Sequence, residues 1–402
     1  METLRAGHAV ALCVLALLTL GIVMVTSAGL TIDPEQAVSL QGILTSRTTI
    51  YAAVAVGLMI AGAHIDPASL HRRLGARWSP AWLIVGVSVV FLVLVQFDGV
   101  GREVNGARRW INLGPVGLNL SFQPSELAKW ATVYAVAVWG VTRGRESMGR
   151  FLAGLAPCLA GVMLVCGLIV VEDLGTAVLI CAVAVVMLFA AGARWWHLAA
   201  LAPAPLAAFI AALLTSPYRM DRVHAFIDPY VDPADKGYHM IQSMVAVSNG
   251  GATGRGLGHG VQKFGYLPED TTDFLFAIIC EELGVLGAIL VVFLYGALLL
   301  AGLRILRRQR DDLGRLFALG VLLTIGFQAI INLAVVTGLA PTKGIALPLL
   351  SSGGTGWMLT ALSLGVLVGM DRRSAVDLER SDESTPVDDG VVSIAAPASL
   401  AV

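Results

Sequence analysis

Long apolar runs, separated by short polar segments, dominate the chain from end to end. A helix that spans a membrane needs about 20 mostly apolar residues, and ten runs of about that length can be recognised. They lie near residues 10–30, 49–65, 80–97, 125–142, 151–171, 174–193, 196–215, 273–303, 315–339 and 353–370. The pattern therefore predicts an all-α polytopic membrane protein with ten transmembrane helices.

The composition agrees with this pattern. Hydrophobic residues make up 56% of the 402 residues and charged residues only 14%, whereas roughly 25% are charged in an ordinary soluble domain. A soluble fold of this size could not cover so much apolar surface, so a soluble enzyme is excluded. The net charge of −1 leaves no basic excess for nucleic acid, and we expect no nucleic-acid partner.

Cysteine and histidine give no sign of a disulfide framework or a metal site. The five cysteines lie inside apolar runs without C-x-x-C spacing, and the seven histidines are scattered without an H-E-x-x-H motif. We therefore interpret the cysteines as small core residues and predict no metal ligands.

The distribution of Lys and Arg predicts the orientation in the membrane. With the N-terminus inside, 16 of the 27 basic residues fall on inside segments, and five of the others lie in the long segment 216–272. Long loops cross the membrane largely regardless of charge. We therefore expect both termini inside and 216–272 as a long extracytoplasmic loop between helices seven and eight.

This topology divides the chain into two parts. Residues 1–373 form the transmembrane domain. The stretch 374–402 is rich in Asp, Glu, Ser and Pro and then in small residues, a composition that cannot build a packed core, so it is expected to be a disordered cytoplasmic tail.

Several charged residues lie beside spans at the predicted outer face, where they are costly and hence candidates for function. Glu126 and Lys129 are three residues apart on one predicted helix and can pair, either as a structural ion pair or as part of a site. Arg108 and Arg109 beside Trp110 are suited to anchor the chain at the interface or to hold a lipid phosphate.

Asp273 lies where the longest outer loop meets helix eight, and two aromatic residues, Phe274 and Phe276, are its neighbours in the sequence. It can be an N-terminal charge that interacts with the helix dipole. Alternatively, it is a partly desolvated carboxylate with a raised pKa, suited to general-base chemistry. Glu281 and Glu282 lie roughly 80° and 180° around the same helix from Asp273, so at least one of them needs a partner inside the bundle.

Together, the outer-face motifs resemble those of the SEDS family (shape, elongation, division and sporulation proteins) over essentially the whole span region. P-T-K-G at 341–344 is more similar to division-type than to elongation-type members. The chain departs from the family at Thr271, where a histidine is usual, and at Ser352, where a tyrosine is usual. The motifs that carry the resemblance are G-A-R-R-W-I at 106–111, Q-P-S-E-L-A-K at 123–129, D-L-G-T at 173–176, Y-R-M-D-R at 218–222, L-P-E-D-T-T-D-F-L-F-A-I-I-C-E-E-L-G at 267–284 and L-P-L-L-S-S-G-G at 347–354.

The resemblance implies an inverting glycosyltransferase that polymerises lipid II into peptidoglycan strands on the outer face of the bacterial cytoplasmic membrane, in septal wall synthesis. It implies that Asp273 is the general base that activates the acceptor hydroxyl. The residues expected to bind the substrates, including their pyrophosphates, are Arg108, Arg109, Trp110, Glu126, Lys129, Asp173, Arg222, Gln242, Ser243, Lys263, Glu269, Lys343 and Ser351.

The expected partners are lipid II, the glycan linked to undecaprenyl pyrophosphate, membrane lipid, a class B penicillin-binding protein that acts as transpeptidase, and other division proteins. A divalent cation such as Mg²⁺ or Mn²⁺ is an open expectation, since no dedicated ligand set is visible. The alternatives are a lipid II flippase or transporter, an elongation-type polymerase, and an inactive scaffold of the division machinery. The near absence of charge in the inner half of the spans disfavours a translocation path.

The charge asymmetry generates a prediction about topology. In a variant without the native cysteines, single cysteines at Asp235 and Ser374 are expected to react with a membrane-impermeant label from opposite sides, Asp235 from outside and Ser374 from inside. Labelling of both positions from the same side would contradict the proposed orientation.

Overall fold

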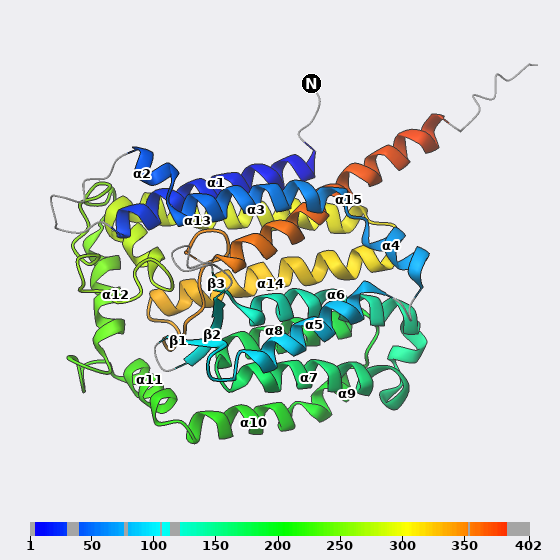
Figure 1. Ribbon diagram of the computed structural model, residues 1–402, viewed down its shortest axis with the longest axis horizontal. Coiled ribbons are helices and arrows are strands. Elements are labelled where there is room, and N and C mark those ends of the chain that lie inside the picture. Colours follow the sequence, from blue (N-terminus) through cyan, green and yellow to red (C-terminus); the bar gives the residue numbers. More distant parts are fainter. Residues whose placement is uncertain are drawn as a thin grey trace, which may run out of the picture.

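A computed structural model describes residues 5–29, 40–75, 79–104, 107–112, 121–352 and 354–383. The described chain is mostly helical, and its long helices run side by side in one bundle (Figure 1). Helices occupy each of the ten predicted ranges. They are α1 (Ala6–Ala28), α3 (Arg47–His64), α5 (Pro80–Leu94), α6 (Pro124–Met148), α7 (Ala156–Val170), α8 (Leu174–Ala190), α9 (Trp195–Leu201) with α10 (Pro203–Leu214), α13 (Leu275–Arg308), α14 (Asp312–Val336) and α15 (Thr355–Glu383).

Length and hydropathy mark some of these helices as membrane spans. Among the described residues, five are long and apolar enough to cross a membrane, and the bent pair of α3 and α4 (Pro67–Leu74) gives up to six. Helices α5 and α8 are apolar but shorter. The predicted class, an all-α polytopic membrane protein, is thereby confirmed, whereas the count of ten spans and their orientation stay predictions.

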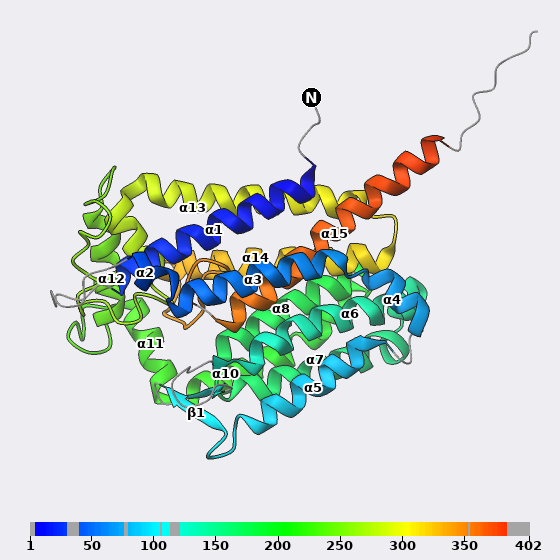
Figure 2. The ribbon, with the colours of Figure 1, turned by 45° about the horizontal axis from the view of Figure 1, so that its top comes forward.

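Close backbone contacts hold α3 against α15. A Cβ atom at Gly62 would lie 2.4 Å from the carbonyl oxygen of Leu362, and one at Gly365 would lie 2.1 Å from that of Met59. Small residues of this kind allow membrane helices to approach closely. Helix α10 is the opposite case, because no residue of the 195–214 segment is buried. It lies along the lower edge of the bundle in Figure 1, whereas α5 lies at the lower edge in the turned view of Figure 2.

One end of the bundle carries most of the extramembrane structure. The long loop contains α11 (Pro217–Ile227) and α12 (Tyr238–Asn249). Beside it lies an antiparallel three-stranded sheet that the sequence did not reveal, with β2 (Ala107–Asn112) between β1 (Gly101–Val104) and β3 (Ser121–Phe122). The strands are only two to six residues long, too short for a clear alternation of apolar and polar positions.

The C-terminal boundary differs from the prediction. Residues 374–383 were expected to belong to a disordered tail, but they continue α15 as far as Glu383. This stretch contains good helix formers such as Ala, Leu, Glu and Arg and has no proline, so nothing in it ends the helix. The remainder of the predicted tail lies outside the described residues.

The glycine-rich segment after α12 is a tight loop, as predicted, and two glutamates of α13 hold it. Glu282 accepts hydrogen bonds from Lys263 Nζ (2.8 Å) and from Ser27 Oγ (2.7 Å), and both acidic neighbours Glu281 and Glu282 are fully buried. Glu281 accepts from the backbone N–H groups of residues 261 and 262 at 3.0 and 3.1 Å. The expectation that a partner inside the bundle satisfies at least one of them is confirmed.

A kink in α13 allows this loop to approach. Gly284 has φ = +65° inside the helix, and a Cβ atom there would lie 2.4 Å from the backbone nitrogen of Gly254. Gly254 itself has φ = +78°, and its Cβ would lie 2.1 Å from the carbonyl oxygen of Glu282. Only glycine tolerates these backbone angles together with so close an approach.

The buried pair of Lys263 and Glu282 leads to a stability prediction. Lys263→Met leaves the Glu282 carboxylate without its counter-charge, and loss of one partner of a buried pair costs about 3–5 kcal/mol. The melting temperature in detergent is therefore expected to fall strongly. The double variant Lys263→Met/Glu282→Gln should recover most of the loss, and an unchanged melting temperature of the single variant would show that the pair contributes nothing.

Candidate active site

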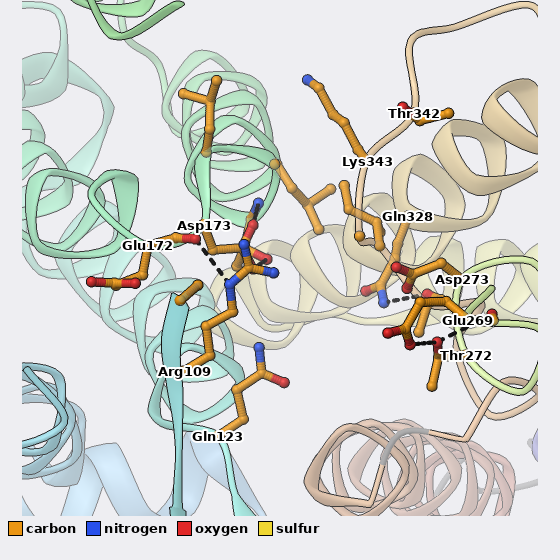
Figure 3. Close-up of a pocket in the computed structure, with 18 of the residues that line it drawn as sticks. Arg109, Gln123, Glu172, Asp173, Glu269, Thr272, Asp273, Gln328, Thr342 and Lys343 are labelled. Carbon is orange, nitrogen blue, oxygen red and sulfur yellow. Dashed lines mark hydrogen bonds between the residues drawn. The ribbon is translucent and has the colours of Figure 1, made fainter. Parts of the chain in front are cut away.

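A cavity of about 850 Å³ opens at the end of the bundle that carries the sheet and α11. Its walls come from β2, from the first turns of α6 and α8, from α10 and α11, from the segment before α13, and from the loop 341–352 (Figure 3). Ten of the residues predicted to act in the site line it. They are Arg109, Trp110, Glu126, Lys129, Asp173, Arg222, Glu269, Asp273, Lys343 and Ser351.

Asp273 lies in the cavity wall just before α13 begins. Its backbone carbonyl oxygen accepts a hydrogen bond from Asn332 Nδ2 at 2.7 Å, so α14 fixes its position. The pKa of the Asp273 carboxyl is raised to about 7, first by burial and then by the neighbouring Glu269 and Asp173, while Arg222 and Arg109 lower it. The carboxylate is thus half ionised near neutral pH, which suits a general base.

Gly344 lies between Asp273 and Arg109. A Cβ atom at this glycine would be 3.1 Å from Asp273 Oδ2 and 3.5 Å from Arg109 Nη1. The missing side chain therefore leaves an open space in which an atom could contact the carboxylate and the guanidinium together.

Three cations line the cavity. Arg109 Nε donates to the Glu172 carbonyl oxygen (2.9 Å), and Arg222 Nη1 donates to that of Thr342 (3.2 Å). Lys343 Nζ lies 5.7 Å from the centre of the Phe209 ring, and burial lowers its pKa, although Asp173 counteracts this. The arrangement offers positive charge to a phosphate from several sides.

Glu126 and Lys129 form the ion pair that the sequence predicted. Lys129 Nζ donates to both carboxylate oxygens of Glu126 at 2.8 Å and to Gln328 Oε1 at 3.0 Å. Gln328 Nε2 in turn donates to the Ala346 carbonyl oxygen at 2.9 Å. The pair therefore braces the loop 341–352 as well as bordering the cavity.

Two further lining residues have local structural partners. Asp173 caps α8, since its carboxylate accepts from the N–H group of Thr176 at 3.0 Å and from its hydroxyl at 2.8 Å. Ser351 Oγ accepts from the Leu347 N–H group at 3.1 Å, and its carbonyl oxygen accepts from Trp357 Nε1 at 2.6 Å. These bonds hold the cavity wall in shape.

Four predicted substrate-binding residues lie outside the cavity lining. Arg108 pairs with Asp98 and Glu103 on the sheet side. Lys263 forms a buried ion pair with Glu282. Ser243 donates to the Val336 carbonyl oxygen at 2.8 Å. Gln242, like Ser243, lies on α12. The alternation of side chains along a strand explains why Arg109 lines the cavity and Arg108 does not, because neighbouring side chains on β2 point to opposite faces.

Sequence reasoning missed some residues that organise the site. Glu172 fixes β2, because its side chain accepts from the Arg108 N–H group at 2.8 Å and its carbonyl oxygen holds Arg109. Thr272 donates to Glu269 Oε2 at 2.7 Å, and Glu269 has a left-handed backbone with φ = 58°. The sequence does carry a signal for Glu172, because the adjacent Glu172 and Asp173 interrupt a long apolar run.

Divalent-cation binding is not supported by the protein side chains alone. Carboxylates suit Mg²⁺ and Mn²⁺, and Asp173, Glu269 and Asp273 share the cavity. Within the described ranges, however, no three side chains of His, Cys, Asp or Glu lie close enough together to hold a metal ion.

The chain is similar to known proteins over most of its length. Residues 8–375 match the family described as "Cell cycle protein", which groups FtsW, RodA and SpoVE. The protein of Hahella chejuensis named "Probable peptidoglycan glycosyltransferase FtsW" is 38% identical, with 93% of this chain and 92% of that protein covered. Stage V sporulation protein E of Bacillus subtilis is 37% identical, with 90% and 95% covered.

A solved structure of similar fold carries the description "Structural coordination of polymerization and crosslinking by a peptidoglycan synthase complex". It is 31% identical, has a TM-score of 0.71, and covers 91% of this chain and 97% of its own. The resemblance inferred from the motifs is thereby confirmed, and the chain belongs to the FtsW/RodA/SpoVE family of cell cycle proteins, the SEDS family.

Proposed function

We propose that this chain is a peptidoglycan glycosyltransferase that polymerises lipid II during septal wall synthesis. The observation that carries the proposal is the position of Asp273, a carboxylate with a pKa of about 7 facing Arg109 across an open space. The names of the FtsW relatives and of the related synthase complex support the same activity.

The proposed step is one inverting displacement. Asp273 takes the proton from the 4-hydroxyl of the acceptor sugar, whose oxygen attacks the anomeric carbon of the donor glycan. The bond from this carbon to the pyrophosphate oxygen breaks, and undecaprenyl pyrophosphate leaves with the electron pair. Arg109, Arg222 and Lys343 stabilise the negative charge that develops on the leaving group.

The apolar side of the cavity suits a lipid-linked substrate. Phe209 and Leu213 of α10 line the cavity, and α10 buries no residue against the bundle. The polyprenyl tail can therefore stay in the outer leaflet beside α10 while the pyrophosphate and sugars occupy the polar end. This explains why a sugar transferase is built as a membrane bundle.

A flippase remains the rival function, and one observation disfavours it. Below Lys129, on the way into the bundle, the described residues enclose a space of only about 10 Å³. Apart from Lys129, its lining has two threonines and otherwise only apolar side chains such as Val133, Leu179 and Met187. A path for pyrophosphate through the membrane would need polar groups there.

The proposal extends to the setting of the enzyme. Ten spans with both termini inside place the cavity at the outer face of the bacterial cytoplasmic membrane. A class B penicillin-binding protein would crosslink the strands that are made here; in its support, the related complex is described as one that coordinates polymerization and crosslinking. The division-type role follows the FtsW relatives.

Removal of the base tests the proposal directly. Asp273→Asn keeps size and removes the basic oxygen, so lipid II polymerisation by the purified protein with its transpeptidase partner is expected to fall about 10²–10⁴-fold. Asp270→Asn, three residues away and outside the cavity lining, is the matched control and should retain activity. Near wild-type polymerisation by Asp273→Asn would refute the assignment, and Glu269 would be tested next.

The pH dependence provides a second test. Only ionised Asp273 accepts a proton, so kcat/KM is expected to rise about tenfold per pH unit at low pH and to level off above the pKa of about 7. Glu269 raises this pKa and Arg222 lowers it. Glu269→Gln should therefore move the midpoint to lower pH and Arg222→Gln to higher pH; a midpoint near pH 4 in the wild type would contradict the proposal.

Gly344→Ala tests the space between base and cation. The added methyl group lies 3.1 Å from Asp273 Oδ2 and displaces whatever contacts Asp273 and Arg109 together. A misplacement of about 1 Å can cost roughly 10²-fold in rate, so kcat should fall with little change in melting temperature. Gly161→Ala, where nothing lies within 4 Å of the new Cβ, is the control, and equal activity of both variants would count against this geometry.

A further inference from the structure

A second cavity, of about 430 Å³, lies at the end of the bundle opposite to α12. Three segments far apart in the sequence form it, namely α4, the turn between α13 and α14, and the C-terminal part of α15. Helix α4 marks this end at the right of Figure 1. The charged side chains that line the cavity are Asp66, Arg72, Arg308, Arg310, Asp311 and Arg373.

The acidic residues of this cavity are engaged as helix caps. Asp66 accepts from the Ala68 N–H group at 3.1 Å at the start of α4, and Asp311 accepts from the Gly314 N–H group at 2.7 Å at the start of α14. Their carboxylates are thus already hydrogen-bonded to backbone, and four arginines face two carboxylates.

The four arginines differ in the contacts that they make with other residues of the protein. Arg373 donates to the Ile65 carbonyl oxygen at 2.8 Å, and Arg308 lies 3.9 Å from Asp371 Oδ1. Arg72 and Arg310 are exposed, and their guanidinium groups make no hydrogen bond or ion pair with any residue that the structure describes. These two guanidinium groups are therefore available to a ligand.

The orientation of the protein in the membrane is enough to explain why arginines occur at this end. It does not explain how they are arranged. The positive-inside tendency requires basic residues near span ends. It does not require three separate segments to bring Arg72, Arg310 and Arg373 to the rim of one cavity. Arg304 and Arg307 satisfy the same tendency on α13 without lining it.

We propose that this basic cavity binds the phosphate headgroup of an anionic phospholipid. Guanidinium forks match phosphate oxygens in pairs, and basic pockets between membrane helices bind such headgroups. A lipid fits better than a soluble phosphate, because α3 and α4 beside the cavity expose Ile60, Ile65 and Leu74, which can contact acyl chains. The proposal is independent of the glycosyltransferase activity; the proposed topology only assigns the lipid to the cytoplasmic leaflet.

The test is native mass spectrometry of the full chain in detergent, titrated with dioleoyl phosphatidylglycerol or dioleoyl phosphatidylcholine. The wild type is expected to retain one phosphatidylglycerol in preference to phosphatidylcholine. Arg72→Gln/Arg310→Gln should bind it about 30-fold more weakly. Arg72→Lys/Arg310→Lys, which keeps both charges, should restore part of the affinity.

Matched charge removal distinguishes a site from general attraction. Arg304→Gln/Arg307→Gln removes the same charge from the same end outside the cavity and should bind phosphatidylglycerol like the wild type. Equal loss in both double variants, or no preference for the anionic lipid, would overturn the proposal. Displacement of the bound lipid by millimolar inorganic phosphate would also overturn it, because the ligand would then be a soluble anion.

Discussion

One side-chain amide holds the two halves of the active site together. Asn332 on α14 donates both of its N–H groups, one to the carbonyl oxygen of Asp273 and one to that of Ile345, each at 2.7 Å. It thereby joins the segment that carries the base to the loop that carries Gly344 and Lys343. Within a membrane bundle, irregular backbone needs partners of this kind, because no water replaces them.

The same constraint explains the other polar groups near the site. Glu281 and Glu282 bind the glycine-rich loop through its own N–H groups, and Gln328 links Lys129 to the loop at Ala346. The two glutamates are thus bonded directly to backbone N–H groups, and Lys129 is connected to the backbone through Gln328. Asp273 differs, since its desolvated carboxyl keeps a pKa of about 7, a cost in stability that serves proton transfer.

The sequence predicted the helical bundle and much of the site because both leave local signals. Apolar runs of span length identify the helices, and the spacing of Glu126 and Lys129 predicts their pair. Arg108 and Lys263 show the limit of such reasoning. Which face of a short strand points into a cavity, and which of two acidic neighbours holds a lysine, depend on tertiary contacts far apart in the chain. Asp173 and Ser351 differ from these, because their side chains bond to groups only three and four residues away in the chain.

Helix α10 is held to the rest of the protein mainly at one end. Arg219 donates to the carbonyl oxygens of Val170 and Ala212, at 2.8 and 3.0 Å, and so ties the C-terminal ends of α7 and α10 together. No residue of α10 is buried, and of its side chains Phe209 and Leu213 line the cavity, so most exchanges of one apolar residue for another elsewhere in α10 leave the core unchanged. We therefore expect bilayer thickness and hydropathy, rather than packing, to limit which residues α10 can carry.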